Sequence, residues 1–283
     1  MKKLVLFDLD GTLVTTGGAG CQALKKGAAK LYKKEPQFEN SLISGRTDLD
    51  NFTIVYGLLH KGKKPTSAEL KKIEKAYVDQ LPTEVHALVR AKKYNLIPGV
   101  DKFLKELSKD KDIVLALGTG NVEKGAYIKL EPSGLGKYFT VGGWGTDGHT
   151  REDMLRAAVK RAEKKYKTTF EPDQVYVIGD THRDICAAKN CGFHSAVITT
   201  GLGDPKKILR AAAELEVKDF KDITTLRVWL GLKTDPKGVK RGNYIMPASA
   251  IEHVFFSRTG IDEDRLKMFR IKKYSDLESG KIM

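Results

Sequence analysis

The sequence is short of the residues that mark a secreted or membrane-bound protein. Three cysteines in 283 residues cannot build a disulfide framework, so we expect a reducing, cytoplasmic setting. The first apolar run is too short for a signal peptide, and no run approaches the length that crosses a membrane. What is present, 41% hydrophobic and 30% charged residues, is the composition of a globular protein with an ample core.

Acidic residues are outnumbered by basic ones, and the formal net charge is +14. Such an excess attracts polyanions at low salt. The lysines are spread over many predicted helices and do not gather with aromatic residues on one segment. Solvated helix faces are therefore favoured over capture of a small anionic substrate, and nucleic acid is the least favoured partner. An organism-wide preference for lysine would produce the same excess.

The chain length and its pattern predict a main domain with an insertion. Residues 18–94 show helical periodicity and no convincing strand, whereas helices and strands alternate from residue 98 onward. Alternation of this kind indicates a parallel sheet covered on both faces. We therefore expect a doubly wound, Rossmann-like α/β core, made of residues 1–17 and 95–230, with an all-helical insertion at 18–94.

Local signals place several elements. Thr66 and Glu69 form a capping box that opens a helix, and Pro82 is expected to end or redirect it. In the core, strands are expected at 113–117, 139–141, 175–178 and 196–198, and helices at about 100–109, 152–165 and 183–190.

The segment 231–283 differs in character from the rest. Residues 234–238 are typical of a linker, and short helices are expected near 251–255 and 266–269. Their apolar positions favour packing on the core or on a second subunit, and the basic residues permit an anionic partner. We treat this segment as a C-terminal extension of unknown role.

The most informative stretch is KLVLFDLDGT, residues 3–12. Its apolar run predicts a buried strand that ends at Asp8 and Asp10, whose side chains point the same way beyond the edge of the sheet. Open α/β folds bind ligands at that edge. Two acids there can hold a cation, or one can attack while the other moves protons. A capped strand end is the plain structural alternative.

A later strand, 175–178, also ends at an acid, in the stretch GDTHRD. Asp180 would add a second carboxylate to a divalent cation held by Asp8. Magnesium suits such a sparse carboxylate site, because it keeps several waters and takes further oxygen from a substrate phosphate. Asp184 can support that site, or serve as an acid favoured by a helix N-terminus.

Candidates for phosphate binding follow the strand at 113–117. The Thr119 hydroxyl can donate to a phosphate oxygen, and the glycine-flanked turn at Gly120 and Asn121 lets backbone N–H groups approach an anion. Arg151 stands where a helix begins and could hold a phosphoryl group. An ordinary strand-to-helix cap and a surface arginine are the plain structural interpretations.

In this order, DLDGT, Thr119, Arg151 and GDTHRD resemble the haloacid dehalogenase-like (HAD) hydrolase superfamily, in particular its phosphoglycolate-phosphatase-like members with a helical cap. The resemblance covers residues 1 to about 230. Lysine is more usual where Arg151 stands, but the 29 residues that separate Arg151 from Asp180 are similar to the family's spacing.

The resemblance implies a two-step phosphoryl transfer. Asp8 would attack phosphorus and form an aspartyl-phosphate, and Asp10 would protonate the leaving oxygen and then deprotonate water. Magnesium would be held by Asp8, Asp180 and the backbone carbonyl of Asp10, with Asp184 in support. The phosphoryl oxygens would be held by Thr119, Gly120, Asn121 and Arg151.

The implied substrate is a small phosphate monoester, phosphoglycolate or another phosphorylated metabolite, handled by a monomer or homodimer. Asp10 favours a phosphatase over a dehalogenase, because carbon–halogen cleavage leaves no alkoxide to protonate. A sugar phosphomutase would keep the same motifs. The sequence also leaves open a nucleic-acid-binding protein and a catalytically idle scaffold.

Specificity is expected to lie in the helical insertion. Arg46, in the stretch SGRTD, follows a glycine at a helix start and could pair with an anionic leaving group. Pairing with an acid of the insertion is its structural alternative. An insertion that closes over the site would exclude water and bulky polymers, which favours a small substrate.

Overall fold

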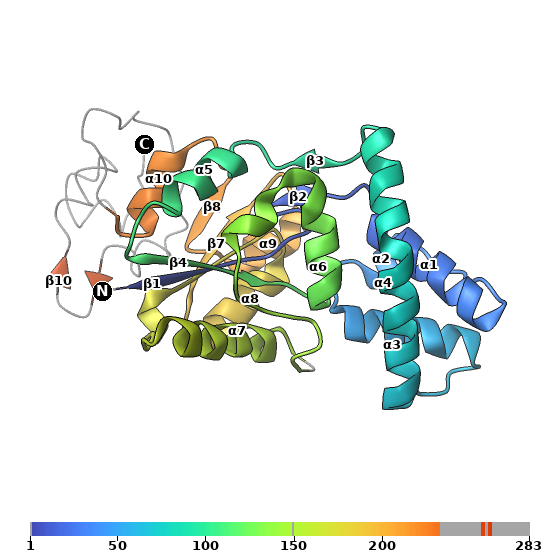
Figure 1. Cartoon of the computed structure of the whole chain (residues 1–283). Coiled ribbons are helices and arrows are strands. Elements are labelled where there is room, and N and C mark those ends of the chain that lie inside the picture. Colours follow the sequence, from blue (N-terminus) through green and yellow to red (C-terminus); the bar gives the residue numbers. More distant parts are fainter. Residues whose placement is uncertain (1, 149, 233–255, 258–259, 262–283) are drawn as a thin grey trace.

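The centre of the computed structural model, which describes residues 2–148, 150–232, 256–257 and 260–261, is a six-stranded parallel sheet (Figure 1). The strand order is β5 (Gly142–Gly143), β4 (Ile113–Gly118), β1 (Lys3–Phe7), β6 (Val175–Gly179), β7 (His194–Ile198), β8 (Leu215–Val217). In β1, Phe7 pairs with Leu117 of β4 and Ile178 of β6. The residues that follow these three strands therefore meet at one edge of the sheet.

Helices cover both faces of the sheet, because successive side chains of a strand point to opposite faces. Val5 and Phe7 pack in one apolar cluster, and Leu4 and Leu6 in another. The first cluster includes residues of three helices, α5 (Val100–Leu107), α6 (Glu123–Leu130) and α10 (Ile223–Trp229). The second includes residues of α7 (Arg151–Tyr166) and α8 (His182–Cys191). Helix α9 (Pro205–Ala211) packs beside α8. Short 3₁₀ helices are η1 (Glu131–Ser133), η2 (Leu135–Tyr138) and η3 (Pro172–Gln174). The doubly wound α/β arrangement is thus confirmed.

The chain between β1 and α5 forms a separate group of helices beyond the carboxyl ends of the strands (Figure 1). These are α1 (Ala19–Tyr32), α2 (Asn40–Ile43), α3 (Asp48–Leu59) and α4 (Ser67–Arg90), which we call the cap helices. They share an apolar cluster that includes Phe52, Ile73 and Tyr77. The chain enters them through β2 (Val14–Thr15) and leaves through β3 (Asn95–Leu96), and these two strands pair antiparallel. Both connections therefore lie beside the end of β1.

The predicted capping box of Thr66 and Glu69 opens α4, but two expectations about elements are wrong. Helix α4 continues through Pro82 to Arg90. Proline removes one backbone donor, and the helix continues because its residues before and after Pro82, Tyr77 and Val85 among them, pack in the same cluster. The strand expected at 139–141 is instead β5 at 142–143, since Phe139 packs in the apolar cluster that contains Val5 and Phe7.

The predictions for the end of the chain lie mostly outside the described residues. These are the linker at 234–238 and the helices near 251–255 and 266–269. Strands β9 (Phe256–Ser257) and β10 (Gly260–Ile261) form an antiparallel pair. Among the described residues, no helix has both the length and the apolar character needed to cross a membrane. The domain boundaries at 17, 94 and 230 stay predictions.

Candidate active site

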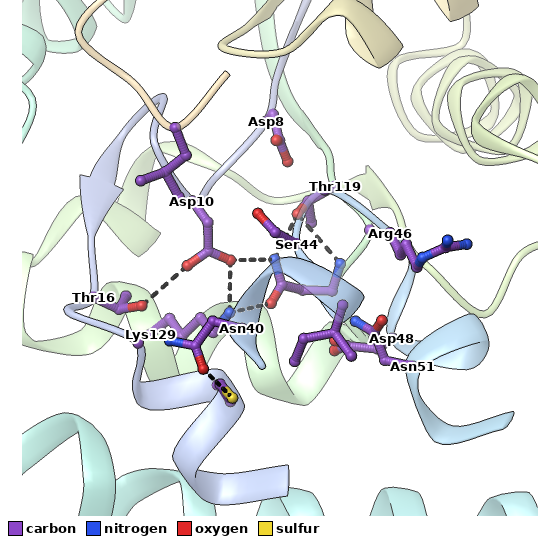
Figure 2. Close-up of a pocket in the computed structure, with 18 of the residues that line it drawn as sticks. Asp8, Asp10, Thr16, Asn40, Ser44, Arg46, Asp48, Asn51, Thr119 and Lys129 are labelled. Atoms are coloured by element: carbon purple, nitrogen blue, oxygen red, sulfur yellow. Dashed lines mark hydrogen bonds and ion pairs between the residues drawn. The ribbon is translucent and has the colours of Figure 1, made fainter. Parts of the chain in front are cut away.

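The residues that follow β1, β4 and β6 line a chamber of about 390 Å³, which the cap helices and residues 44–48, here called the cap loop, close from the other side (Figure 2). Asp8, Asp10, Thr119, Arg151 and Asp180 all line it. The structure thus brings together residues from four sequence motifs at the sheet edge where the strand pattern placed them.

Three acids and one arginine lie together at the floor of this chamber, and of these Asp8, Asp180 and Arg151 line it. Oxygens of Asp8, Asp180 and Asp184 lie within 4.8 Å of one another, and all three residues are buried. Arg151, in the first turn of α7, donates to Asp184 and lies 3.4 Å from Asp8 Oδ2. We call Asp8, Asp180 and Asp184 the acid cluster.

The acid cluster carries more negative charge than its one arginine offsets. Burial raises the pKa of both Asp8 and Asp180 above the ordinary value of 3.8, and the charges of neighbouring acids raise these pKa values further. Arg151 acts in the opposite direction on both. Close-set buried carboxylate oxygens are the ligands that a hard divalent cation prefers. The residues present therefore fit a divalent cation.

The two residues after Asp10 lie against the Asp180 carboxylate. Gly11 has φ = 85°, and a Cβ there would lie 2.1 Å from Asp180 Oδ2, so glycine is needed for the backbone to pass this carboxylate. The Thr12 hydroxyl donates to Asp180 Oδ1 at 3.5 Å, and the Leu202 N–H donates to Oδ2 at 2.5 Å. The DLDGT stretch therefore orients an acid that follows it by about 170 residues.

Asp184 belongs both to a helix cap and to the acid cluster. Its Oδ2 accepts from the Thr181 N–H at 3.1 Å and from the Thr181 hydroxyl at 2.7 Å, in the capping box that opens α8. Its Oδ1 accepts from Arg151. The helix cap thus holds Asp184 in the position from which it faces Arg151 and the acid cluster.

Asp10 lies in different surroundings, among donors (Figure 2). Its Oδ1 accepts from the Thr16 hydroxyl at 3.2 Å. Its Oδ2 accepts from Asn121 Nδ2 at 3.0 Å and from Lys129 Nζ at 2.6 Å, and Lys129 also donates to Asn121 Oδ1 at 2.6 Å. We call Thr16, Asn121 and Lys129 the donor cluster.

Lys129 is the principal site residue that the sequence motifs miss. It lies on α6, outside every motif, and is only 5% exposed. Val122 and Ala126 stand seven and three positions before it and are also buried, so all three share one face of the helix. A lysine on an otherwise apolar face was the signal that the sequence offered.

Of the predicted phosphate-binding residues, Thr119 and Arg151 keep a donor for a ligand, whereas Gly120 and Asn121 contact neighbouring residues. Thr119 Oγ1 accepts from the Asn121 N–H at 3.3 Å and from Asn121 Nδ2 at 2.7 Å, which leaves its own proton for another acceptor. Arg151 Nε is buried and has no hydrogen-bond partner among the described residues. Asn121, in contrast, uses its side chain on Asp10, Thr119 and Lys129. At Gly120, a Cβ would lie 2.8 Å from a carbonyl oxygen of the cap loop.

That cap loop, residues 44–48, is bonded to the core at two places. The Gly45 carbonyl accepts from Arg183 at 2.6 Å and from Arg151 at 3.5 Å. The Asp48 N–H donates to the Gly120 carbonyl at 2.7 Å, and Asp48 Oδ2 accepts the Val122 N–H at 2.9 Å. Burial raises the pKa of Asp48 to about 6. These contacts hold the cap helices over the chamber.

Arg46 belongs to the same loop, but its guanidinium is turned away from the acids. Its Nε donates to the Leu42 carbonyl at 3.0 Å, and Figure 2 shows the side chain directed away from Asp8 and Asp10. The residue is exposed, and no ion pair with an acid of the cap is found within the described residues. Arg46 lines the chamber, but its side chain is not directed at Asp8 or Asp10, and its pairing with an anionic leaving group stays a prediction.

The chain is similar to known proteins in sequence and in fold. Residues 5–198 match the sequence model of the family described as haloacid dehalogenase-like hydrolase. The chain is 26% identical to phosphoglycolate phosphatase 1 of Pseudomonas aeruginosa over 79% of each chain. It is 25% identical to the phosphorylated carbohydrates phosphatase of Thermotoga maritima, over 79% of this chain and 97% of the relative. The crystal structure of a putative beta-phosphoglucomutase from Thermotoga maritima matches with a TM-score of 0.53 and 25% identity, over 80% of this chain and 99% of that structure.

Proposed function

Because the chain belongs to the haloacid dehalogenase-like hydrolase family, we propose that it hydrolyses a small phosphate monoester through an aspartyl-phosphate on Asp8. The phosphatase names of its relatives support this reaction class. One observation carries the proposal: Asp8 lies in the acid cluster beside Arg151, whereas Asp10 lies among donors. Two carboxyls in contrasting environments can divide the roles of nucleophile and proton carrier.

In the first step, a carboxylate oxygen of Asp8 attacks phosphorus, and the bond from phosphorus to the ester oxygen breaks. Asp10 gives a proton to that oxygen, so the product alcohol leaves neutral. In the second step, Asp10 takes a proton from water as the water oxygen attacks phosphorus. The bond between phosphorus and Asp8 then breaks, and inorganic phosphate leaves.

The proton on Asp10 belongs on Oδ1. Both groups that face Oδ2, the Asn121 amide and the Lys129 ammonium, can only donate there. The Thr16 hydroxyl that faces Oδ1 can either donate or accept. When Asp10 is protonated, Thr16 can accept from Oδ1, and when Asp10 is ionised it can donate back.

The phosphoryl oxygens would be held by Thr119 and Arg151. The Thr119 hydroxyl retains its proton for a ligand, and the buried Arg151 Nε retains a donor. Charge spreads over the phosphoryl oxygens as the transition state forms, and donors already in place stabilise that charge without reorganisation.

The acid cluster would hold magnesium through Asp8 and Asp180, together with the backbone carbonyl of Asp10, and Asp184 would support it. When bound, the cation supplies positive charge that keeps Asp8 ionised and offsets the charge of the phosphate. Without it, burial and neighbouring acids favour the protonated form of Asp8, which is a poor nucleophile.

The substrate is proposed to be a small phosphorylated metabolite. A chamber of about 390 Å³ is at the lower end of the range for small-molecule sites. Phosphoglycolate and phosphorylated carbohydrates appear in the names of the relatives, and either fits this size class. A screen of phosphorylated metabolites in the presence of magnesium identifies the substrate by release of inorganic phosphate.

The proposal is tested by trapping the intermediate. The chain is mixed with p-nitrophenyl phosphate and magnesium, quenched in acid and digested, and the peptide that contains Asp8 is examined by mass spectrometry for one added phosphoryl group. Phosphate release with no label on Asp8, or unchanged turnover by Asp8→Asn, contradicts the proposal.

A sugar phosphomutase is the second candidate, favoured by the similarity to the putative beta-phosphoglucomutase. A mutase returns the phosphoryl group from Asp8 to a sugar hydroxyl and requires a bisphosphate activator. Product analysis with a sugar phosphate separates the two activities: an isomeric sugar phosphate indicates a mutase, and free sugar with inorganic phosphate indicates a phosphatase.

A further inference from the structure

We propose that Lys129 is a positioning residue for Asp10, a role that rests on the proposed phosphatase chemistry. Lys129 holds the Asp10 carboxylate with Oδ2 turned toward α6 and Oδ1 toward Thr16. That orientation presents one oxygen of Asp10 for proton transfer in both steps. Lys129 does not lie next to the acid cluster in sequence and belongs to none of the motifs that predict the site.

The contacts of Lys129 fix its ammonium between two acceptors. Nζ lies 2.6 Å from Asp10 Oδ2 and 2.6 Å from Asn121 Oδ1. Asn121 in turn donates to the same Asp10 oxygen at 3.0 Å. The three side chains therefore form a closed ring of charge-assisted hydrogen bonds, in which a rotation of the Asp10 carboxylate breaks two bonds at once.

The surrounding chain is arranged to hold this ammonium. The Lys129 carbonyl accepts from the Tyr94 hydroxyl at 2.9 Å, beside the strand through which the chain leaves the cap helices. Gly20 of α1 lies near the ammonium, and a Cβ there would lie 3.2 Å from Lys129 Nζ. The absence of a side chain at Gly20 leaves room for the ammonium. Groups from the core and from the cap thus both define its position.

A merely structural ion pair would make the same contacts, but it would behave differently in kinetics. Loss of a structural pair lowers the amount of folded protein and affects all substrates alike. Loss of a positioning residue slows the steps in which Asp10 moves a proton, while substrate binding is nearly unchanged. The division between kcat and KM, and the step that becomes slow, distinguish these roles.

The experiment compares Lys129→Met with Lys124→Met in the full chain with magnesium. Lys124 is an exposed lysine on the same helix, so the control removes an equal charge. For an alkyl phosphate, we expect Lys129→Met to lower kcat by about 10²-fold with KM within about threefold, as expected when a proton carrier is misplaced. Lys124→Met is expected to match the unaltered chain.

An aryl phosphate isolates the second step. Nitrophenolate leaves without a proton, so Lys129→Met still forms the aspartyl-phosphate quickly but hydrolyses it slowly. Stopped-flow measurement should show a burst of nitrophenolate close to one per active site, followed by slow turnover. A decrease in kcat without a burst, or kinetics equal to those of Lys124→Met, overturns the proposal.

Gly20→Ala provides a second variant that leaves Lys129 in place. Alanine favours a helix over glycine, and its Cβ would press on the ammonium, so we expect an unchanged or higher melting temperature with kcat lowered about three- to tenfold. If Lys129→Met does not fold, this variant decides: unchanged kcat overturns the proposal. If the unaltered chain hydrolyses no phosphate ester, the proposed function fails instead, and the two failures are thereby distinct.

Discussion

Asp8 and Asp10 are separated by one residue, yet the two carboxyls lie in opposite surroundings. Asp8 shares the acid cluster with Asp180 and Asp184, and the cluster faces one arginine. Asp10 accepts from three donors, one of them a buried lysine. This difference is the basis for the proposed division into a nucleophile and a proton carrier, because the environment of a carboxyl sets the role that it can take.

The two clusters also differ in where their residues come from. The acid cluster is built from strand ends and the first turn of a helix in the α/β core. The donor cluster takes Thr16 from the connection to the cap helices and Lys129 from the end of α6. The acid cluster, proposed to hold the cation, thus depends on the sheet. The donor cluster, proposed to orient the proton carrier, depends on how the cap helices join the core.

The largest effect is expected from Asp8→Asn, which removes the nucleophile from the acid cluster. Turnover should fall by about 10⁴- to 10⁶-fold, the order seen when a nucleophile is deleted, and no phosphoenzyme should form with any ester. Phosphate release and mass spectrometry of the quenched protein measure both. Asp112→Asn, an exposed acid at the far end of β4, serves as the control and should retain full activity.

A smaller effect that differs in kind is expected from Asp10→Asn. Removal of the proton carrier should lower kcat by about 10²- to 10⁴-fold, but an aryl phosphate should still label Asp8 because its leaving group needs no proton. Acid-quench mass spectrometry then detects accumulated phosphoenzyme. Failure to label Asp8 would mean that the two acids do not divide the chemistry as the contrast between the clusters indicates.

The stabilisation of the folded protein by magnesium should depend on pH. The pKa values of Asp8 and Asp180 are raised by burial and neighbouring acids, so their contribution to folding without metal is favourable at low pH and is lost as pH rises through those values. Magnesium prefers the ionised acids and offsets this loss. At a magnesium concentration of about a hundred times Kd, binding stabilises the folded protein by about 2.7 kcal/mol. This stabilisation should therefore be larger at about pH 8 than at about pH 5.5.

Thermal unfolding with and without magnesium at the two pH values measures this difference. In Asp180→Asn, the increase in melting temperature that magnesium causes should be small and nearly independent of pH. Equal stabilisation of both proteins, or equal stabilisation at both pH values, would show that the cation binds away from the acid cluster.

The smallest effect concerns the support that the cap gives to the donor cluster. Asp48 accepts the Val122 N–H at the start of α6, the helix that carries Lys129. Asp48→Ala should lower the free energy of unfolding by about 1 kcal/mol relative to Asp48→Asn, because the asparagine can still accept that bond. Urea unfolding measures the difference. Equal stability of the two variants would mean that this contact does not support the donor cluster.

Much of the core arrangement was predictable from local pattern. The apolar runs ending at Asp8 and Asp180 are fully buried strands of a parallel sheet, so their hydrophobicity is continuous and easily recognised. The same pattern places Thr119 at the edge of the sheet. Errors arose where packing overrode a local signal, as at Pro82 within α4 and at Phe139, which fills the core in place of extending a strand.

The donor cluster was not predictable in the same way. Asn121, a predicted phosphate-binding residue, lines the chamber, and its side chain also bonds to Asp10 and Lys129. Arg46, the predicted specificity residue, also lines the chamber, with its guanidinium directed away from Asp8 and Asp10. Side-chain direction at these positions depends on contacts between segments that are distant in sequence, and a motif contains no information about them.

The sequence by itself determined the α/β core, the inserted helices and the acids at the strand ends, because strand and helix periods and strand-terminal carboxylates are local properties. Only the tertiary structure decided that Asp8 joins Asp180 and Arg151 while Asp10 joins Thr16, Asn121 and Lys129. The physical reason is that the environment of a carboxyl is set by burial and by neighbouring charges from distant parts of the chain. Two acids that look equivalent in the sequence are therefore made different by the fold.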